Sequence, residues 1–219
     1  MARVLIVSGG REPFVDPWHP YAETSRRLAA IALDRRHVVE VSDDPVGRLI
    51  EGLDGVDVLV SNLPDPDDGV SQDQRALVAR ALDEWASTGV GVLGVHVGMT
   101  GLLGWPRWSP LMGARWAGGA SGHPPLGLSR IRTLPHRLTD GASEFEVMDE
   151  RYTGLEVTAG FAAAADHEVD GVIHPLIWSR REGPIRIVVD ALGHGVESFD
   201  APEHRAIVGR ALDWLAERD

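Results

Sequence analysis

Short apolar runs alternate with amphipathic segments along the first half of the chain. Apolar runs at residues 4–8, 37–41, 56–60 and 90–95 predict β-strands, and the last of them is apolar throughout, as strands buried on both faces are. Apolar residues at helical spacing in 21–33 and after Ser71 predict helices between these strands, and Ser71 with Gln74 has the spacing of a capping box. This alternation favours an α/β fold with three layers, in which helices cover both faces of a doubly wound, mostly parallel sheet.

The second half of the chain has a different pattern. Residues 101–125 carry tryptophans among prolines and glycines without regular periodicity, which predicts a loop-rich insertion. Apolar stretches at 145–148, 156–165, 172–178 and 185–190 predict further strands, and the apolar face of residues 201–217 predicts a closing helix. We expect a single domain over residues 1–219.

Composition excludes several classes of function. The net charge of −12 argues against a nucleic-acid partner. The chain shows neither a membrane-spanning apolar window nor a signal-peptide pattern, so we expect a cytoplasmic protein without a membrane partner. Cysteine is absent and all 21 basic residues are arginine, which excludes thiolate nucleophiles, disulfides and lysine Schiff bases.

Candidate chemistry follows the predicted strands. His96 lies on a glycine-rich turn of the kind that presents a nucleophile in α/β hydrolases, but imidazole acts instead as an acid, a base or a metal ligand. Gly10, Glu150 and His194 also come directly or shortly after strands, with His19 a little beyond Gly10. Because the carboxyl ends of parallel strands meet at one edge of a sheet, three histidines and a carboxylate are expected to converge there.

This set of side chains leaves the chemistry open. Imidazole with carboxylate suits zinc, although no HExxH spacing is present. The turn after the first strand lacks the continuation of a dinucleotide fingerprint or P-loop, so nucleotide cofactors are disfavoured. His96 could instead fill the edge of the core, and Glu150 could belong to a solvated acidic surface.

The order of short motifs resembles the ThuA-like (trehalose utilisation) family, whose fold is similar to the flavodoxin-like fold of class I glutamine amidotransferases. The resemblance covers almost the whole chain and rests on Gly9-Gly10 with His19-Pro20, Gly94-Val95-His96, Gly113-Ala114-Arg115-Trp116, Gly122-His123-Pro124, Asp149-Glu150-Arg151-Tyr152, Pro175-Leu176-Ile177-Trp178 and Gly193-His194. The order Pro135-His136 and the turn at Gly183-Pro184 depart from the family pattern. In the related amidotransferases the turn at His96 would hold the catalytic cysteine, so the resemblance implies no glutaminase activity here.

The resemblance implies carbohydrate metabolism, with a disaccharide or keto-sugar as the small-molecule partner. We expect acid-base or metal-assisted catalysis by His96, Glu150 and His194, which are also the expected ligands of a divalent metal such as zinc or manganese. Five further residues are expected to bind the substrate, and among them the Trp178 ring would stack on the sugar. They are Gly10, His19, His123, Tyr152 and Trp178.

Two alternatives stand beside the enzyme. The absence of a strong catalytic motif is also compatible with a sugar-binding or regulatory protein that has the same pocket without turnover. A third hypothesis is an interaction subunit in which the segment from Trp105 to Trp116 is an apolar docking patch, and a homo-oligomer is one possible assembly.

Overall fold

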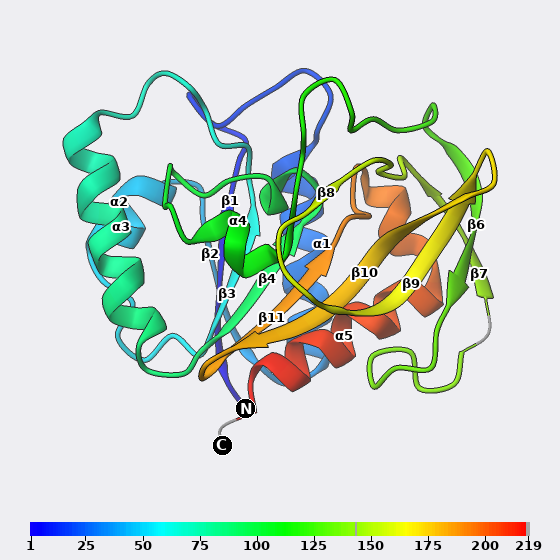
Figure 1. The fold of residues 1–219 in the computed structure, drawn as a ribbon. Helices are drawn as coiled ribbons and strands as arrows, with labels where there is room; N and C mark the ends of the chain where they lie inside the picture. The colour runs from blue at the N-terminus through cyan, green and yellow to red at the C-terminus, as the bar shows by residue number, and fades with distance from the viewer. Residues whose placement is uncertain (143, 218–219) are drawn as a thin grey trace.

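A nine-stranded β-sheet runs through the middle of the protein in this computed structural model, which describes residues 1–142 and 144–217 (Figure 1). The strand order is β2-β1-β3-β4-β11-β10-β9-β6-β7, and a separate ladder joins β5 to β8. The strands are β1 (Arg3–Ser8), β2 (Val38–Ser42), β3 (Val58–Asn62), β4 (Gly91–Val95), β5 (Ala114–Arg115), β6 (Gly127–Thr133), β7 (Glu144–Asp149), β8 (Glu156–Val157), β9 (Ala162–Val169), β10 (Val172–Glu182) and β11 (Ile185–Asp190).

Helices cover both faces of the parallel part of the sheet (Figure 1). They are α1 (Tyr21–Asp34), α2 (Pro45–Ile50), α3 (Gln72–Ala86), α4 (Trp108–Met112) and α5 (Pro202–Leu215), with short 3-10 helices η1 (His96–Met99) and η2 (Val196–Asp200). Helix α1 packs beside α5, and α2 packs beside α3 on the opposite face. The predicted capping box is present, because Ser71 and Gln74 each accept a hydrogen bond from the other's backbone N–H.

The predicted α/β class is confirmed, with one addition. Strands β2, β1, β3, β4 and β11 pair in parallel, whereas β10, β9, β6 and β7 extend the sheet in antiparallel fashion. Strands β4 and β11 are buried along their whole length, while β7 alternates exposed and buried residues. This difference is expected, because helices cover both faces only where the sheet is parallel.

Several predicted boundaries are wrong. The apolar stretch 156–165 is two strands, β8 and the first half of β9, and the prediction missed α2 and β6 altogether. In β6 only Ser129 and Ile131 are buried, so its apolar signal is weak. The β9–β10 turn, Asp170-Gly171, has positive φ at both residues, as a tight two-residue hairpin requires.

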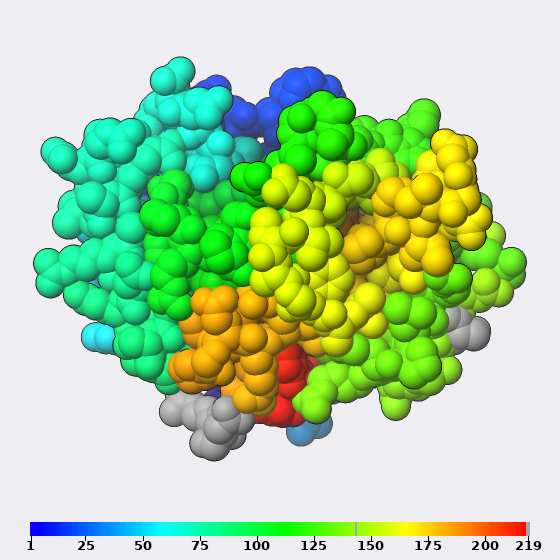
Figure 2. All heavy atoms as spheres, viewed as in Figure 1, coloured from blue at the N-terminus to red at the C-terminus, as the bar shows by residue number. Residues whose placement is uncertain are grey.

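The segment 101–125 contains two short elements, α4 and β5, with irregular chain before and after them. Strand β5 pairs with β8, and Figure 2 shows these green and yellow segments side by side on one face of the molecule. Trp105 and Trp108 are buried in the core, so the docking patch predicted for residues 105–116 is wrong for two of its three tryptophans.

None of the helices in the described part of the chain has the length and apolar content needed to span a bilayer.

The turn after β4 is tightly packed. His96 begins η1 with a φ of 46°, in the left-handed region that residues with a side chain rarely adopt. Two residues later, a Cβ atom on Gly98 would lie 2.1 Å from the backbone oxygen of Ser61, at the end of β3. Only glycine fits there, and its close contact with β3 fixes the direction in which the turn leaves the sheet.

We predict that Gly98→Ala lowers the free energy of unfolding by about 2 kcal/mol or more, because backbone of β3 or η1 must move to accommodate the methyl group. Gly118→Ala is the matched control, since a Cβ atom at Gly118 would have no neighbour within 4 Å. Urea unfolding of both variants checks this. Equal stability of the two would contradict the packing described for the turn.

Candidate functional site

Four side chains meet at the carboxyl edge of the parallel strands. The potential ligand atoms of His19, His96, Glu150 and His194 all lie within 4.8 Å of one another. His96 follows β4, Glu150 follows β7, His194 follows β11, and His19 lies in the loop between β1 and α1. The sequence predicted this convergence, and we refer to the four residues as the His₃Glu cluster.

His96 presents an acceptor nitrogen to the centre of the cluster. Its side chain is only 2% exposed, and its Nδ1 lies 2.9 Å from the carbonyl oxygen of Ala191. A carbonyl oxygen only accepts, so Nδ1 carries the hydrogen and Nε2 keeps its lone pair. Burial lowers the pKa of His96 well below its ordinary value, against the smaller opposing effect of the Ala191 hydrogen bond. The ring is therefore neutral at pH 7.

Asp16 orients His19 in the same way, and the sequence reasoning missed it. Both carboxylate oxygens of Asp16 lie 2.8 Å from Nδ1 of His19, and one of them accepts a hydrogen bond from the Tyr21 hydroxyl. Burial alone would raise the pKa of Asp16, but the bonds from Tyr21 and His19 outweigh it and lower the pKa. An ionised carboxylate only accepts, so Nδ1 of His19 is the donor and Nε2 is the nitrogen left to act as a ligand. The spacing Asp16–His19 was the available signal.

One oxygen of Glu150 lies among three imidazoles. Its Oε2 is 3.3 Å from Nδ1 of His194, 3.5 Å from Nε2 of His123 and 3.9 Å from Nε2 of His96. Within the described residues, the His194 and His96 nitrogens are buried and have no hydrogen-bond partner. Burial also lowers the pKa of His194, although the Glu150 charge opposes this effect. Potential metal-ligand atoms thus converge on one point.

Among the predicted substrate-binding residues, His123 and Tyr152 lie at the cluster and Trp178 does not. The Tyr152 ring stacks on His96 at a centroid distance of 4.5 Å. Trp178 is 0% exposed, donates its indole N–H to the carbonyl of Met112 and stacks on Phe161. Its predicted role on a sugar ring is therefore wrong, because the ring is part of the core.

Gly10 shapes the loop between β1 and α1, and the side-chain contacts described above for the cluster do not involve it. It has a φ of 116° and donates its N–H to the carbonyl of Phe14, so it begins the loop that carries Asp16 and His19. A direct contact between Gly10 and substrate stays a prediction.

Two buried aspartates hold the loop that carries His194. Asp149 accepts hydrogen bonds from the backbone N–H groups of Gly193 and His194, at 2.7 and 3.2 Å. Burial raises the pKa of Asp149 to about 6, although hydrogen bonds from Ser198 and Gly193 oppose this effect. Asp190 accepts from the N–H of Leu192 and fixes the start of the same loop.

A buried histidine lies behind this loop. His204 is 2.7 Å from Asp190 through Nε2, and its Nδ1 is 2.8 Å from the carbonyl of Ser198. Burial lowers the pKa of His204, but the Asp190 charge and the hydrogen bonds to Asp190 and Ser198 raise it to about 9. His204 is thus the charged partner of Asp190.

The cluster matches the donor set of a divalent transition metal. Three imidazoles and one carboxylate are ligands of zinc, manganese and related ions. Two of the rings are oriented by hydrogen bonds from their other nitrogen, as metal-binding histidines usually are. Without a metal, the same groups have the residue types of acid-base catalysts.

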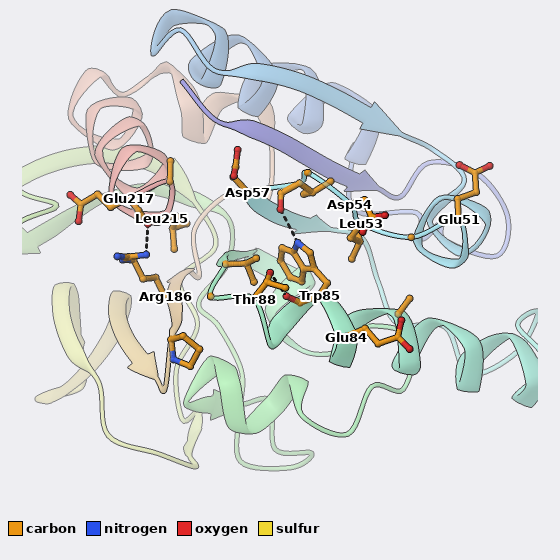
Figure 3. A pocket seen from close by; sticks show the side chains of 18 of the residues that line it. Glu51, Leu53, Asp54, Asp57, Glu84, Trp85, Thr88, Arg186, Leu215 and Glu217 are labelled. Carbon is orange, nitrogen blue, oxygen red and sulfur yellow. Dashed lines mark hydrogen bonds between the residues drawn. The ribbon is translucent and has the colours of Figure 1, made fainter. Parts of the chain in front are cut away.

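A large cavity lies away from the cluster. A cavity of about 880 Å³ opens at the amino ends of β3, β4 and β11, on the opposite edge of the sheet from His96 (Figure 3). Acidic side chains such as Glu51, Asp54 and Glu84 lie around it, with Trp85 and Arg186. In an open α/β sheet the carboxyl ends of the strands form the binding crevice, so we place the functional site at the cluster.

Comparison with known proteins agrees with the fold. The family model ThuA, described as trehalose utilisation, matches residues 3–215. A ThuA-like protein of known structure from Parabacteroides merdae is 16% identical, with a TM-score of 0.76 over 98% of this chain and 90% of that one. A second from Bacteroides uniformis is 15% identical, with a TM-score of 0.75 over 100% and 92%.

A more distant similarity extends to the amidotransferase-like proteins. A Thermoplasma acidophilum protein described as part of a GMP synthase is 18% identical, with a TM-score of 0.56 over 98% of this chain and 96% of that one. At such identities these structures show the fold alone. No curated protein sequence matches this chain.

We predict that stability falls as the pH rises from about 6.5 to about 9, because His204 is charged and paired with Asp190 in the folded state. Its folded pKa lies above the unfolded value of 6.5, so its contribution is complete below pH 6.5 and is lost as the pH approaches 9. The loss is on the order of 3 kcal/mol at most. Urea unfolding across this range measures it.

The His204→Gln variant should be less stable than the wild type at pH 6. Its free energy of unfolding should change much less than that of the wild type between pH 6.5 and 9. A slope as steep in the variant as in the wild type would show that another group is responsible.

Proposed function

The chain belongs to the ThuA (trehalose utilisation) family, and from this premise we propose that it is a carbohydrate-processing enzyme that uses a divalent cation bound by the His₃Glu cluster. The proposed substrate class is a disaccharide or keto-sugar, in keeping with the family description. The observation that carries the proposal is the convergence of potential ligand atoms from His96, His194 and Glu150, two of which are buried nitrogens without a hydrogen-bond partner among the described residues. His19, expected at first to bind substrate, is included as the fourth ligand.

Physical chemistry supports a cation at this point. The lone pair on Nε2 of neutral His96 repels a Glu150 carboxylate oxygen 3.9 Å away. Buried polar atoms without partners, here Nε2 of His96 and Nδ1 of His194, also cost free energy. A divalent cation removes both penalties at once. Zinc and manganese both accept imidazole and carboxylate ligands, and the low pKa of His96 and His194 keeps these rings available for binding near neutral pH.

A bound cation of this kind supplies Lewis acidity, which polarises a sugar carbonyl or activates a hydroxyl or water. His123 lies outside the four-residue set, and its side chain is 36% exposed, more than those of the cluster. Its Nδ1 faces the carbonyl of Pro124, so Nε2 is the acceptor and points toward Glu150. In our proposal His123 accepts or returns a substrate proton at Nε2. A thiol mechanism is excluded, because the sequence contains no cysteine.

We predict that the purified protein binds one equivalent of zinc or manganese after chelator treatment and reloading. His19→Ala and Glu150→Gln should each weaken this binding tenfold or more, since each removes one ligand of the cluster. His136→Ala is the control, because His136 contacts Ser179 and Leu138 and not the cluster. Metal competition titrations give the affinities. Equal affinity for all three variants would contradict the proposed ligands.

We predict turnover of trehalose or its keto derivative by the metal-loaded protein. His123→Gln should retain the metal and lower kcat by about 10²- to 10⁴-fold, the usual contribution of a general acid or base. Product analysis by mass spectrometry with a known sugar is the measurement. Tight sugar binding without product would favour the alternative of a sugar-binding or regulatory protein, and unchanged kcat in His123→Gln would remove His123 from the mechanism.

A further inference from the structure

The rim of the cluster is formed by a short arm, residues 116–123, which follows β5. Trp116 begins the arm and is 36% exposed, and His123 ends it beside Glu150. The cluster side chains beneath are much less exposed, at 2 to 16%. A molecule that approaches the cluster from the side of Glu150 and His123 therefore meets the arm first.

The arm is held in one position by the segment that follows Glu150. Gly122 and Thr153 exchange backbone hydrogen bonds of 3.1 and 2.7 Å, and the Ser121 hydroxyl donates to the carbonyl of Gly154. A Cβ atom on Gly154 would lie 2.3 Å from the backbone oxygen of Ala120, so only glycine permits this close approach. The arm is thus attached to the same short segment that carries Glu150 and Tyr152.

Aromatic contacts connect the exposed end of the arm to the cluster. The Trp116 ring meets Tyr152 nearly perpendicularly, with centroids 4.9 Å apart, and Tyr152 stacks on His96. The Trp116 and His123 rings are 6.4 Å apart. Trp116, Tyr152 and His123 therefore lie on one side of the cluster, where Trp116 and His123 are partly exposed and Tyr152 is buried.

We propose that Trp116 is the sugar-stacking residue of this site, and that a neutral pyranose ring lies against its indole with hydroxyl groups directed at His123 and Glu150. This inference rests on the proposed function and deepens it. One face of a pyranose is formed by C–H groups and packs on an aromatic ring, while its hydroxyls need polar partners at the ring edge. Trp116 is partly exposed, whereas the originally predicted Trp178 is fully buried, so the geometry assigns the stacking role to the arm.

The test is calorimetric titration of trehalose and of its keto derivative into zinc-loaded protein. Trp116→Ala should raise the Kd about tenfold or more, as expected when a stacked aromatic anchor is removed. Trp116→Phe keeps an aromatic face and should stay within about threefold of the wild type. Both variants should retain one equivalent of zinc, because Trp116 is not among the cluster ligands.

A second readout does not depend on the alanine variant being folded. Sugar should change the tryptophan fluorescence of the wild type, and this change should disappear in Trp116→Phe while binding persists. Wild-type affinity in Trp116→Ala, or an unchanged fluorescence response in Trp116→Phe, would overturn the assignment while leaving the proposed function standing. Failure of the wild type to bind either sugar would instead overturn both.

Discussion

The site depends on an excess of buried hydrogen-bond acceptors. The Ala191 carbonyl and the Asp16 carboxylate accept the Nδ1–H groups of His96 and His19, so Nε2 of each ring is the nitrogen left to bind a cation in the cluster. Glu150 adds a carboxylate oxygen to the same space. Such a set is costly when buried alone and favourable around a cation, so metal binding is central to the proposed function.

The fold supplies this arrangement through loops that begin where strands end. Ala191, which fixes the tautomer of His96, and His194 lie on one loop after β11, and Asp149 and Asp190 hold that loop by backbone hydrogen bonds. The buried carboxylates are therefore structural supports of the cluster rather than members of it. A rigid outer layer of this kind raises metal affinity, because the ligands need not reorganise on binding.

The sequence predicts the framework better than it predicts contacts across the chain. Alternating apolar runs predicted the parallel strands. Because the carboxyl ends of such strands meet at one edge of the sheet, the positions of His96, Glu150 and His194 after strands predicted that they meet. Periodicity does not reveal β6, where only two residues are buried, nor the antiparallel pairing of the second half. Whether a tryptophan faces the core or the solvent depends on packing between distant segments, so the sequence did not reveal that Trp178 is buried and Trp116 partly exposed.

X-ray absorption spectroscopy of the metal-loaded protein tests the central claim most directly. Fine-structure analysis at the zinc or manganese edge reports the atoms around the ion and recognises imidazole by its outer-ring scattering. We predict three imidazoles and one carboxylate oxygen in the first coordination shell, with water or sugar oxygens in any remaining positions. A shell of oxygen atoms with no imidazole scattering would contradict this prediction, because the ion would then be bound away from the cluster.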